Sequence, residues 1–418
     1  MAPYDSEPGA DDGSLEALRE RNRLRVVDAL RRSGTATRGD LARLTGLSRT
    51  TVASLVADLA ARGLVVPPRE AAETRPGARG RPPGLLRLDP SAGVALGIDF
   101  GHRHVRVAAA DLASTVLAEA HAQLDVDGDA GAALDTAADL VCRVLADSDI
   151  DRSRVVAAGM GLPGPYDRRR RTVSSSSILL GWVGIDARAE LAQRIEVEVE
   201  ADNDANLGAL GELTFGAARG LADVVYVKIA TGIGAGLILD GSLRRGATGI
   251  AGELGHVQVN FDGVVCNCGG RGCLQTLAST ESLLAAARAA HGPELTLAGL
   301  IELVNAGDFG SRRLVGEAGR AVGAVLADLC NHVNPEAIVV GGELSEAGEP
   351  LLGGIREALD RYVLPGAAQA VEVKPGELGE RAEVLGALAL VIRNTEGVKS
   401  TALAGFELQQ EEVRAEST

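Results

Sequence analysis

The 418-residue sequence has few aromatic residues and no long apolar run. Aromatic side chains make up 2% of a chain whose hydrophobic content is 46%, so its cores must be built from Ala, Val, Leu and Ile. No stretch reaches the roughly 18 apolar residues that a transmembrane helix requires. Residues 1–30 also lack the apolar segment of a signal peptide. We therefore expect a cytoplasmic protein with no membrane partner.

Cysteine is scarce, which excludes the disulfide framework of a small secreted protein. Two of the five cysteines, Cys142 and Cys330, stand in helix-like apolar patterns, where we expect inert core residues. The other three gather in Cys266-Asn267-Cys268-Gly269-Gly270-Arg271-Gly272-Cys273, shortly after Gly252-Glu253-Leu254-Gly255-His256. Three thiolates and one imidazole are the ligands that zinc prefers in a closed structural site. We predict a structural zinc site formed by His256, Cys266, Cys268 and Cys273, the alternatives being a disulfide or small buried residues.

The chain as a whole also lacks an excess of positive charge, and its formal net charge is −15. A uniform charge of this sign would argue against nucleic acid as a partner. However, residues 1–88 contain 15 Arg and 11 Asp or Glu, a net charge of +4, and the rest of the chain carries −19. A small basic head on a large acidic body is typical of a DNA-binding module joined to a ligand-binding module.

The length of the chain predicts two or three domains, because one hydrophobic core does not support so many residues. Residues 1–14 are acidic and without periodicity, and we expect a disordered tail there. The basic head follows over residues 15–88 and the acidic body, in two lobes, over 89–395. Residues 396–418 form a C-terminal tail.

The head has the pattern of a helix-turn-helix. Apolar periodicity, including Leu18, and turn residues predict helices over residues 15–32, 38–44 and 49–62. Ser48 suits the N-cap of the third helix, and Gly63 suits its end. In this motif the first residues of the second helix of the pair contact base edges in the major groove. We therefore assign DNA contacts to Ser48, Arg49, Thr50 and Thr51; an ordinary three-helix bundle is the alternative.

A wing is predicted after the third helix. Residues 64–66 and 85–88 read as two paired strands, and the segment between them carries Arg75, Arg79 and Arg81 among Gly and Pro. Arg side chains on such a tip can enter a narrow minor groove. A solvated linker is the alternative, and a winged helix-turn-helix that binds operator DNA is our interpretation.

The body alternates strands and helices, which predicts an α/β architecture. Strands are expected over residues 94–100, 105–110, 155–162, 224–229, 237–239 and 337–340. Three glycine-containing turns follow apolar strands: Asp99-Phe100-Gly101, a turn from Thr231 to Gly236 that includes Gly232 and Gly234, and Gly341-Gly342. Such turns can place N–H groups around a phosphate, although a plain turn between strands uses the same residues. Their convergence would be the layout of a sugar kinase with an actin-like fold.

A polar constellation, Asp202-Asn203-Asp204-Ala205-Asn206, lies between a predicted strand and a predicted helix. Amide and carboxylate groups at a strand end suit hydrogen bonding to neighbouring sugar hydroxyls, and one carboxylate could take a proton from a hydroxyl. Asx turns and a helix cap are the alternative. Trp182, the only Trp, could stack on a sugar ring or anchor the core.

Together these residues resemble the ROK family, named for repressors, open reading frames and kinases. The resemblance covers residues 15–395 and is carried by the segments Glu253 to His256, Cys266 to Cys273, Asn203 to Asn206 and Gly80-Arg81-Pro82. It implies a two-lobed actin/hexokinase-like fold, to which repressor members add an N-terminal winged helix-turn-helix.

The resemblance also implies residue roles. Asp204 matches the catalytic base of the kinases, Asn203 and Glu253 match sugar contacts, and His256 would contact the sugar while it binds zinc. Asp99 and Gly101 stand at the first phosphate turn. The second phosphate motif is matched by Thr231, Gly232 and Gly234, and part of the adenosine motif by Gly341 and Gly342.

Two departures from the family pattern concern catalysis. Kinases of the family read Asp-x-Gly-Gly-Thr-Lys at the first phosphate turn, where this chain has His102 and Arg103 after Gly101. These bulky residues disfavour closure of the backbone around ATP, although Arg103 could bind a phosphate by itself. Gln275 stands where kinases carry Glu, and its amide can still bind a sugar hydroxyl.

Two functions are consistent with this pattern. The favoured one is a sugar-responsive transcriptional regulator, a repressor, that binds operator DNA as a homodimer or homotetramer and senses a sugar or sugar phosphate. The alternative is a glucokinase-like sugar kinase that uses ATP and magnesium, with Asp204 as base and a fused regulatory head. A zinc hydrolase is disfavoured, because four protein ligands leave no coordination position for water.

Overall fold

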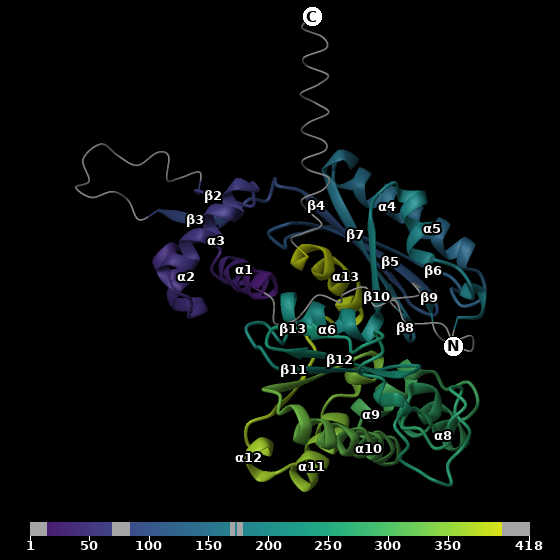
Figure 1. Ribbon diagram of the computed structural model, residues 1–418. Coiled ribbons are helices and arrows are strands. Elements are labelled where there is room, and N and C mark those ends of the chain that lie inside the picture. Colours follow the sequence, from purple (N-terminus) through teal and green to yellow (C-terminus); the bar gives the residue numbers. More distant parts are fainter. Residues whose placement is uncertain (1–14, 69–83, 168–171, 174–178, 395–418) are drawn as a thin grey trace, which may run out of the picture. The chain divides into compact units, whose positions relative to one another are not determined.

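The computed structural model describes residues 15–68, 84–167, 172–173 and 179–394, which form two compact units (Figure 1). Of the described residues, the first unit contains 15–68, 84–94, Ala110–Val116 and 392–394, and the second contains Ala95–Ala109 and those described between Leu117 and Val391. The predicted tails and the predicted wing tip lie outside the described residues. Among the described helices, none is long and apolar enough to cross a membrane.

The head has the predicted helix-turn-helix and paired strands. Its described elements are α1 Leu15–Ser33, β1 Ala36–Thr37, α2 Arg38–Thr45, α3 Arg49–Ala61, β2 Val65–Val66 and β3 Leu85–Leu88. Strand β3 is central, with β1 and β2 as antiparallel partners on its two sides. The predicted helices and strands are confirmed. Strand β1 was not predicted, because two residues are too few for an alternating pattern.

Local hydrogen bonds fix the turn between α2 and α3. Gly46 ends α2 with a φ of 69°, a left-handed conformation that glycine adopts at little steric cost. The Ser48 Oγ then accepts a hydrogen bond from the Thr51 N–H at 3.1 Å, which caps α3 as predicted. Both helix ends are therefore defined within the turn itself.

The described core of the head is aliphatic and also includes the buried cation Arg23. Leu18 is exposed, so the prediction that it shares the apolar face of α1 was wrong. Arg23 of the same helix is 2% exposed, and its Nε lies 3.2 Å from Asp58 Oδ2 on α3. The buried face of α3 consists of Val52, Leu55, Val56 and Leu59.

The second unit is built on two five-stranded sheets. The first has the order β10-β7-β4-β5-β6, with β4 Val94–Phe100, β5 His104–Asp111, β6 Val116–Gln123, β7 Val155–Leu162 and β10 Val199–Asn203. The second has the order β13-β12-β11-β14-β15, with β11 Val224–Ile229, β12 Ile233–Leu239, β13 Ser242–Arg244, β14 Ala337–Gly341 and β15 Glu372–Pro375. Strands β8 Tyr166–Asp167 and β9 Thr172–Val173 form a small hairpin. The predicted α/β architecture with two lobes is confirmed.

Two helices, α6 Asp204–Phe215 and α13 Ala382–Arg393, lie between these sheets (Figure 1). Helix α6 contacts β7 and β10 of the first sheet and β11, β12 and β13 of the second. The opposite face of the second sheet is covered by helices α8 Thr280–His291, α9 Leu297–Asn305, α10 Phe309–Val333 and α11 Glu349–Tyr362. Helices α4 Ala130–Asp147 and α5 Ala187–Ile195 pack together beside the first sheet. Because α6 begins where β10 ends, its first residues lie at the junction of the lobes.

Close packing of α6 corrects the predicted turn from Thr231 to Gly236. Strand β12 begins at Ile233, so Gly234 and Gly236 lie in the strand and only Ala230 to Gly232 forms the turn. A Cβ at Gly236 would lie 2.5 Å from the Cβ of Ala209 and 2.7 Å from the carbonyl oxygen of Ala205, both on α6. These glycines let a helix approach a strand, which the sequence pattern does not distinguish from a phosphate-binding turn.

The burial of Cys142, Cys330 and Trp182 decides between the roles predicted for them. Cys142 is exposed on α4, so the prediction of a core cysteine was wrong there, whereas Cys330 is buried on α10. Trp182 is 1% exposed, donates from Nε1 to the Val126 carbonyl at 2.8 Å, and meets the Phe100 ring edge-on. Trp182 is therefore a core anchor.

Candidate functional site

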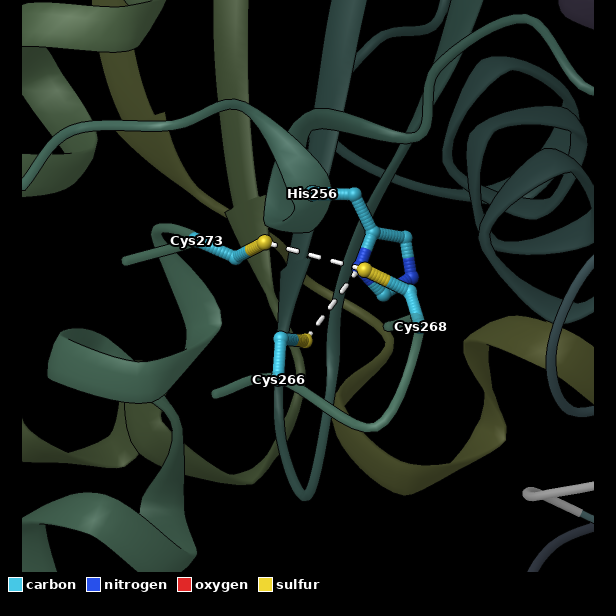
Figure 2. Close-up of side chains that lie close together, drawn as sticks. All are labelled: His256, Cys266, Cys268 and Cys273. Carbon is cyan, nitrogen blue, oxygen red and sulfur yellow. Dashed lines mark hydrogen bonds between the residues drawn. The ribbon is translucent and has the colours of Figure 1, made fainter. Parts of the chain in front are cut away.

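Three sulfur atoms and one imidazole come together in the second unit (Figure 2). His256 ends the short helix η4 Leu254–His256, and Cys273 precedes α7 Gln275–Ala278. Cys266 and Cys268 lie in the loop between these helices. One ligand atom from each of the four lies within 4.8 Å of all the others, and the side chains point toward one another.

The distances in this cluster fit a tetrahedral metal site. Cys268 Sγ lies 3.7 Å from Cys273 Sγ, and His256 Nδ1 lies 3.7 Å from Cys266 Sγ. Zinc–sulfur bonds of about 2.3 Å at tetrahedral angles separate two sulfurs by about 3.8 Å. A disulfide requires about 2.05 Å, and all five cysteines are free. The donor set and spacing therefore fit zinc, and the disulfide alternative is not supported.

Backbone groups in the loop also favour a metal site. The Gly270 N–H donates to Cys268 Sγ at 3.4 Å, which lowers the pKa of that thiol. Burial, followed by hydrogen bonds with the neighbouring thiols, raises the pKa of Cys273 to about 12. A bound cation would hold Cys273 as the thiolate, since a coordinated thiol loses its proton.

His256 lies between the cysteine cluster and Glu253. Its Nδ1 faces Cys266, while its Nε2 lies 3.9 Å from Glu253 Oε2. Burial lowers the pKa of His256, which favours the neutral imidazole that binds metal. Metal coordination through Nδ1 would fix the ring and direct Nε2 toward Glu253.

Glu253 is partly buried near a second carboxylate. Burial, and then the charge of Asp204, raises the pKa of Glu253 to about 7. Near neutral pH this carboxyl group is therefore present in both protonation states. It can accept a hydrogen bond from a hydroxyl group or donate one to it.

Asn203 and Asp204 stand where β10 passes into α6. The Asn203 Oδ1 accepts hydrogen bonds from the N–H groups of Ala205 and Asn206, so Asn203 is the N-cap of α6. Its Nδ2 donates to Gly164 O and to Asp204 Oδ1, both at 2.9 Å. The helix-cap interpretation is thus correct for Asn203. Because both its donors and its acceptor are engaged, Asn203 orients Asp204 in this structure, and its predicted sugar contact stays a prediction.

A lysine that was not predicted as a site residue lies beside Asp204. Lys228 Nζ on β11 lies 2.9 Å from Asp204 Oδ2 and 3.0 Å from Glu383 Oε1 on α13. A single charged residue inside the apolar strand Val224–Ile229 was the available signal. We call Asn203, Asp204, Lys228, Glu253 and His256 the polar cluster.

At the first predicted phosphate turn, the His104 side chain packs against Asp99 and Gly101. His104 Nε2 lies 3.0 Å from Asp99 Oδ2, and a Cβ at Gly101 would collide with the His104 ring. His102 pairs with Asp127 through Nδ1 at 2.8 Å. The absence of a side chain at Gly101 therefore makes room for His104, and the assignment of Asp99 and Gly101 to nucleotide stays a prediction.

The remaining predicted nucleotide residues also have packing roles. A Cβ at Gly341 would collide with the Tyr226 ring, and Gly342, with a φ of 81°, approaches the backbone of Ile229. Gly234 faces Ala205 of α6. Thr231 and Gly232 remain in the turn before β12, where their assignment to nucleotide stays a prediction.

Gln275 contacts the cysteine loop, the segment that carries Cys266 and Cys268. Its Nε2 donates to Asn267 Oδ1 at 2.8 Å and lies 3.2 Å from Cys266 Sγ. A Cβ at Gly255 would lie 3.1 Å from the Gln275 Oε1. The amide nitrogen thus supports the cysteine loop, and the carbonyl oxygen is the group that could meet a hydroxyl.

The predicted DNA contacts are partly described. Ser48, Arg49 and Thr50 are exposed at the start of α3, and Thr51 is half-buried. The Ser48 hydroxyl is engaged with Thr51, so among these four residues Arg49 and Thr50 are the exposed side chains best placed to contact DNA. The predicted contacts Arg75, Arg79 and Arg81 lie outside the described residues.

Comparison with known proteins agrees with this geometry. A model described as the ROK family matches residues 95–394. The chain belongs to the ROK family. A second model, described as the MarR family, matches residues 20–75 of the head.

Relatives of the ROK protein include repressors and kinases. It is 29% identical over 393 residues to the xylose repressor of Caldicellulosiruptor bescii, which covers 91% of this chain and 97% of the repressor. A crystal structure of a ROK family transcriptional regulator, a homologue of E. coli Mlc, has a TM-score of 0.74 at 24% identity over 92% of this chain and 98% of that one, and shows the same fold. A ROK family glucokinase from Streptomyces griseus, in complex with glucose and AMPPNP, has a TM-score of 0.61 at 32% identity over 71% of this chain and 99% of that one.

The metal assignment predicts a specific loss in Cys268→Ala. Purified wild-type protein should contain about one zinc per chain, and the variant should lose most of it, because only three ligands of the tetrahedral shell remain. We also expect a lower melting temperature. Zinc content by atomic emission and thermal unfolding measure both effects.

Cys142→Ala is the matched control, since Cys142 is an exposed cysteine outside the cluster. It should keep zinc and stability. Full zinc content in Cys268→Ala, or none in the wild type, would contradict the assignment.

Proposed function

We propose that this ROK protein is a sugar-responsive transcriptional repressor. The head binds operator DNA, and the polar cluster binds a sugar or sugar phosphate whose presence changes DNA binding. The observation that carries this proposal is the likeness to a xylose repressor over 91% of the chain, head included, whereas the glucokinase with glucose and AMPPNP covers 71%. We expect a homodimer or homotetramer, because helix-turn-helix proteins read paired half-sites.

The polar cluster suits recognition of hydroxyl groups. Asp204 supplies a carboxylate at the start of α6, and the Glu253 carboxyl group can donate or accept a hydrogen bond. His256 Nε2 lies 3.9 Å from Glu253 Oε2. The carbonyl oxygen of Gln275 is a further candidate. Zinc bound by His256, Cys266, Cys268 and Cys273 would hold the imidazole edge that faces the ligand.

Phosphoryl transfer is disfavoured by the first phosphate turn. His102, which pairs with Asp127, and Arg103 stand where kinases of the family carry Gly and Thr, and these bulky residues disfavour closure of the backbone around ATP and its magnesium ion. A ligand that prefers one arrangement of the lobes can still shift a conformational equilibrium without chemistry.

A sugar panel separates the repressor from the kinase alternative. We expect some sugar or sugar phosphate to raise the melting temperature and to change the affinity for a DNA duplex selected from a random pool by the full-length protein. With ATP and magnesium, a coupled ADP assay should detect no sugar-dependent turnover. Robust turnover that Asp204→Asn abolishes would overturn the repressor proposal in favour of the kinase.

Arg49→Ala tests the DNA-binding surface. Loss of a base or phosphate contact at the start of α3 should weaken binding to the selected duplex by about 5- to 150-fold, equivalent to about 1–3 kcal/mol. The sugar-induced thermal shift should be unchanged. A fluorescence-anisotropy titration measures the DNA affinity.

The exposed Arg313 on α10 provides the control, because Arg313→Ala removes the same charge from the body. Equal DNA affinity of Arg49→Ala and Arg313→Ala would remove α3 from the proposed interface.

A further inference from the structure

Glycines on the two neighbouring strands leave space beside Lys228. Its register partners are Gly234 on β12 and Gly341 on β14, neither of which carries a side chain. The lysine side chain is 21% exposed and extends from an otherwise apolar strand. The cost of placing an ammonium group here must be offset by ion pairs.

Two carboxylates from different helices hold this ammonium group. Asp204 Oδ2 lies 2.9 Å from Nζ, and Glu383 Oε1, on a side chain that is 7% exposed, lies 3.0 Å from it. Burial alone would lower the pKa of Lys228, but the charges of Asp204, Glu383 and Asp99 raise it well above its usual value. Lys228 therefore keeps its charge at neutral pH.

The contacts of Asp204 leave it little remaining capacity. Its Oδ1 accepts from the Ala205 N–H at 2.8 Å and from Asn203 Nδ2 at 2.9 Å, and its Oδ2 accepts from Lys228. A carboxylate oxygen accepts about two hydrogen bonds. One acceptor position therefore remains, on Oδ2, and its direction is set by the lysine.

We propose that Lys228 is a positioning residue for sugar recognition, which fixes Asp204 as the acceptor for one hydroxyl group of the ligand. The inference rests on the proposed sugar site. The competing explanation is structural: Lys228 could serve only as the counter-ion of buried Glu383. The two explanations differ in what happens when the charge of Glu383 is removed together with that of Lys228.

The experiment compares Glu383→Gln, Lys228→Met and the double variant Lys228→Met/Glu383→Gln in the full-length protein. Calorimetric titration with D-xylose and D-glucose, and then with the remaining sugars and sugar phosphates of the panel, measures affinity. Thermal unfolding and binding to the selected DNA duplex report the folded state. Glu383→Gln keeps the bond between Lys228 and Asp204, so it should bind sugar nearly as well as the wild type.

Lys228→Met should unfold at a lower temperature, because Glu383 is left buried without its partner. The double variant should recover that stability and still bind sugar at least about tenfold more weakly, the effect of losing a charged hydrogen bond that orients the acceptor. Wild-type affinity in the stable double variant would overturn the proposal and leave Lys228 a counter-ion. Failure of the wild type itself to bind any sugar of the panel would instead reject the proposed site, and the inference with it.

Discussion

The imidazole of His256 is the constraint on which the functional region depends. One ring nitrogen faces three cysteine sulfurs and the other faces Glu253, so the metal cluster and the polar cluster share a single side chain. The shared ring means that the orientation of a ligand contact is set by a group on its far side. In the proposed function, the cysteine loop and η4 would therefore support the ligand site as well as the local fold.

The second support is the start of α6. Asn203 spends all its hydrogen-bonding capacity on the helix start, on Gly164 and on Asp204, and Lys228 takes one position on the other oxygen of Asp204. The helix itself approaches β12 closely because glycines face it there. The orientation of Asp204 is therefore determined by packing between the two sheets as well as by its immediate partners.

Features that depend on local sequence were predictable. The ligand spacing of the cysteine loop, the Ser48 cap and the ends of the head helices each follow from a few neighbouring residues, and the structure agrees with them. Features set by distant partners were not. Glu383 meets Lys228 only through the fold, and the glycines at 236 and 341 carry no local mark that separates close packing from phosphate binding. The prediction that Cys142 is a core residue was wrong for a related reason, since an apolar pattern does not determine which face of a helix other elements cover.

The ROK fold is shared by proteins named as repressors and as kinases, so the fold alone does not assign the activity. The distinction lies in the site. Here His102 and Arg103 replace the Gly and Thr of the kinase motif at the first phosphate turn, while Asp204, Glu253 and His256 supply the groups proposed to bind a sugar. These two features favour the proposed sensing role over phosphoryl transfer.

The central claim, that the metal braces the ligand site through His256, is tested most directly by sugar affinity with and without zinc. The sugar identified by screening would be titrated calorimetrically into zinc-loaded protein and into chelator-treated protein that circular dichroism shows to be folded. The account predicts that removal of zinc weakens sugar binding by at least about tenfold, and that added zinc restores it. Unaltered sugar affinity in folded, metal-free protein would contradict the account.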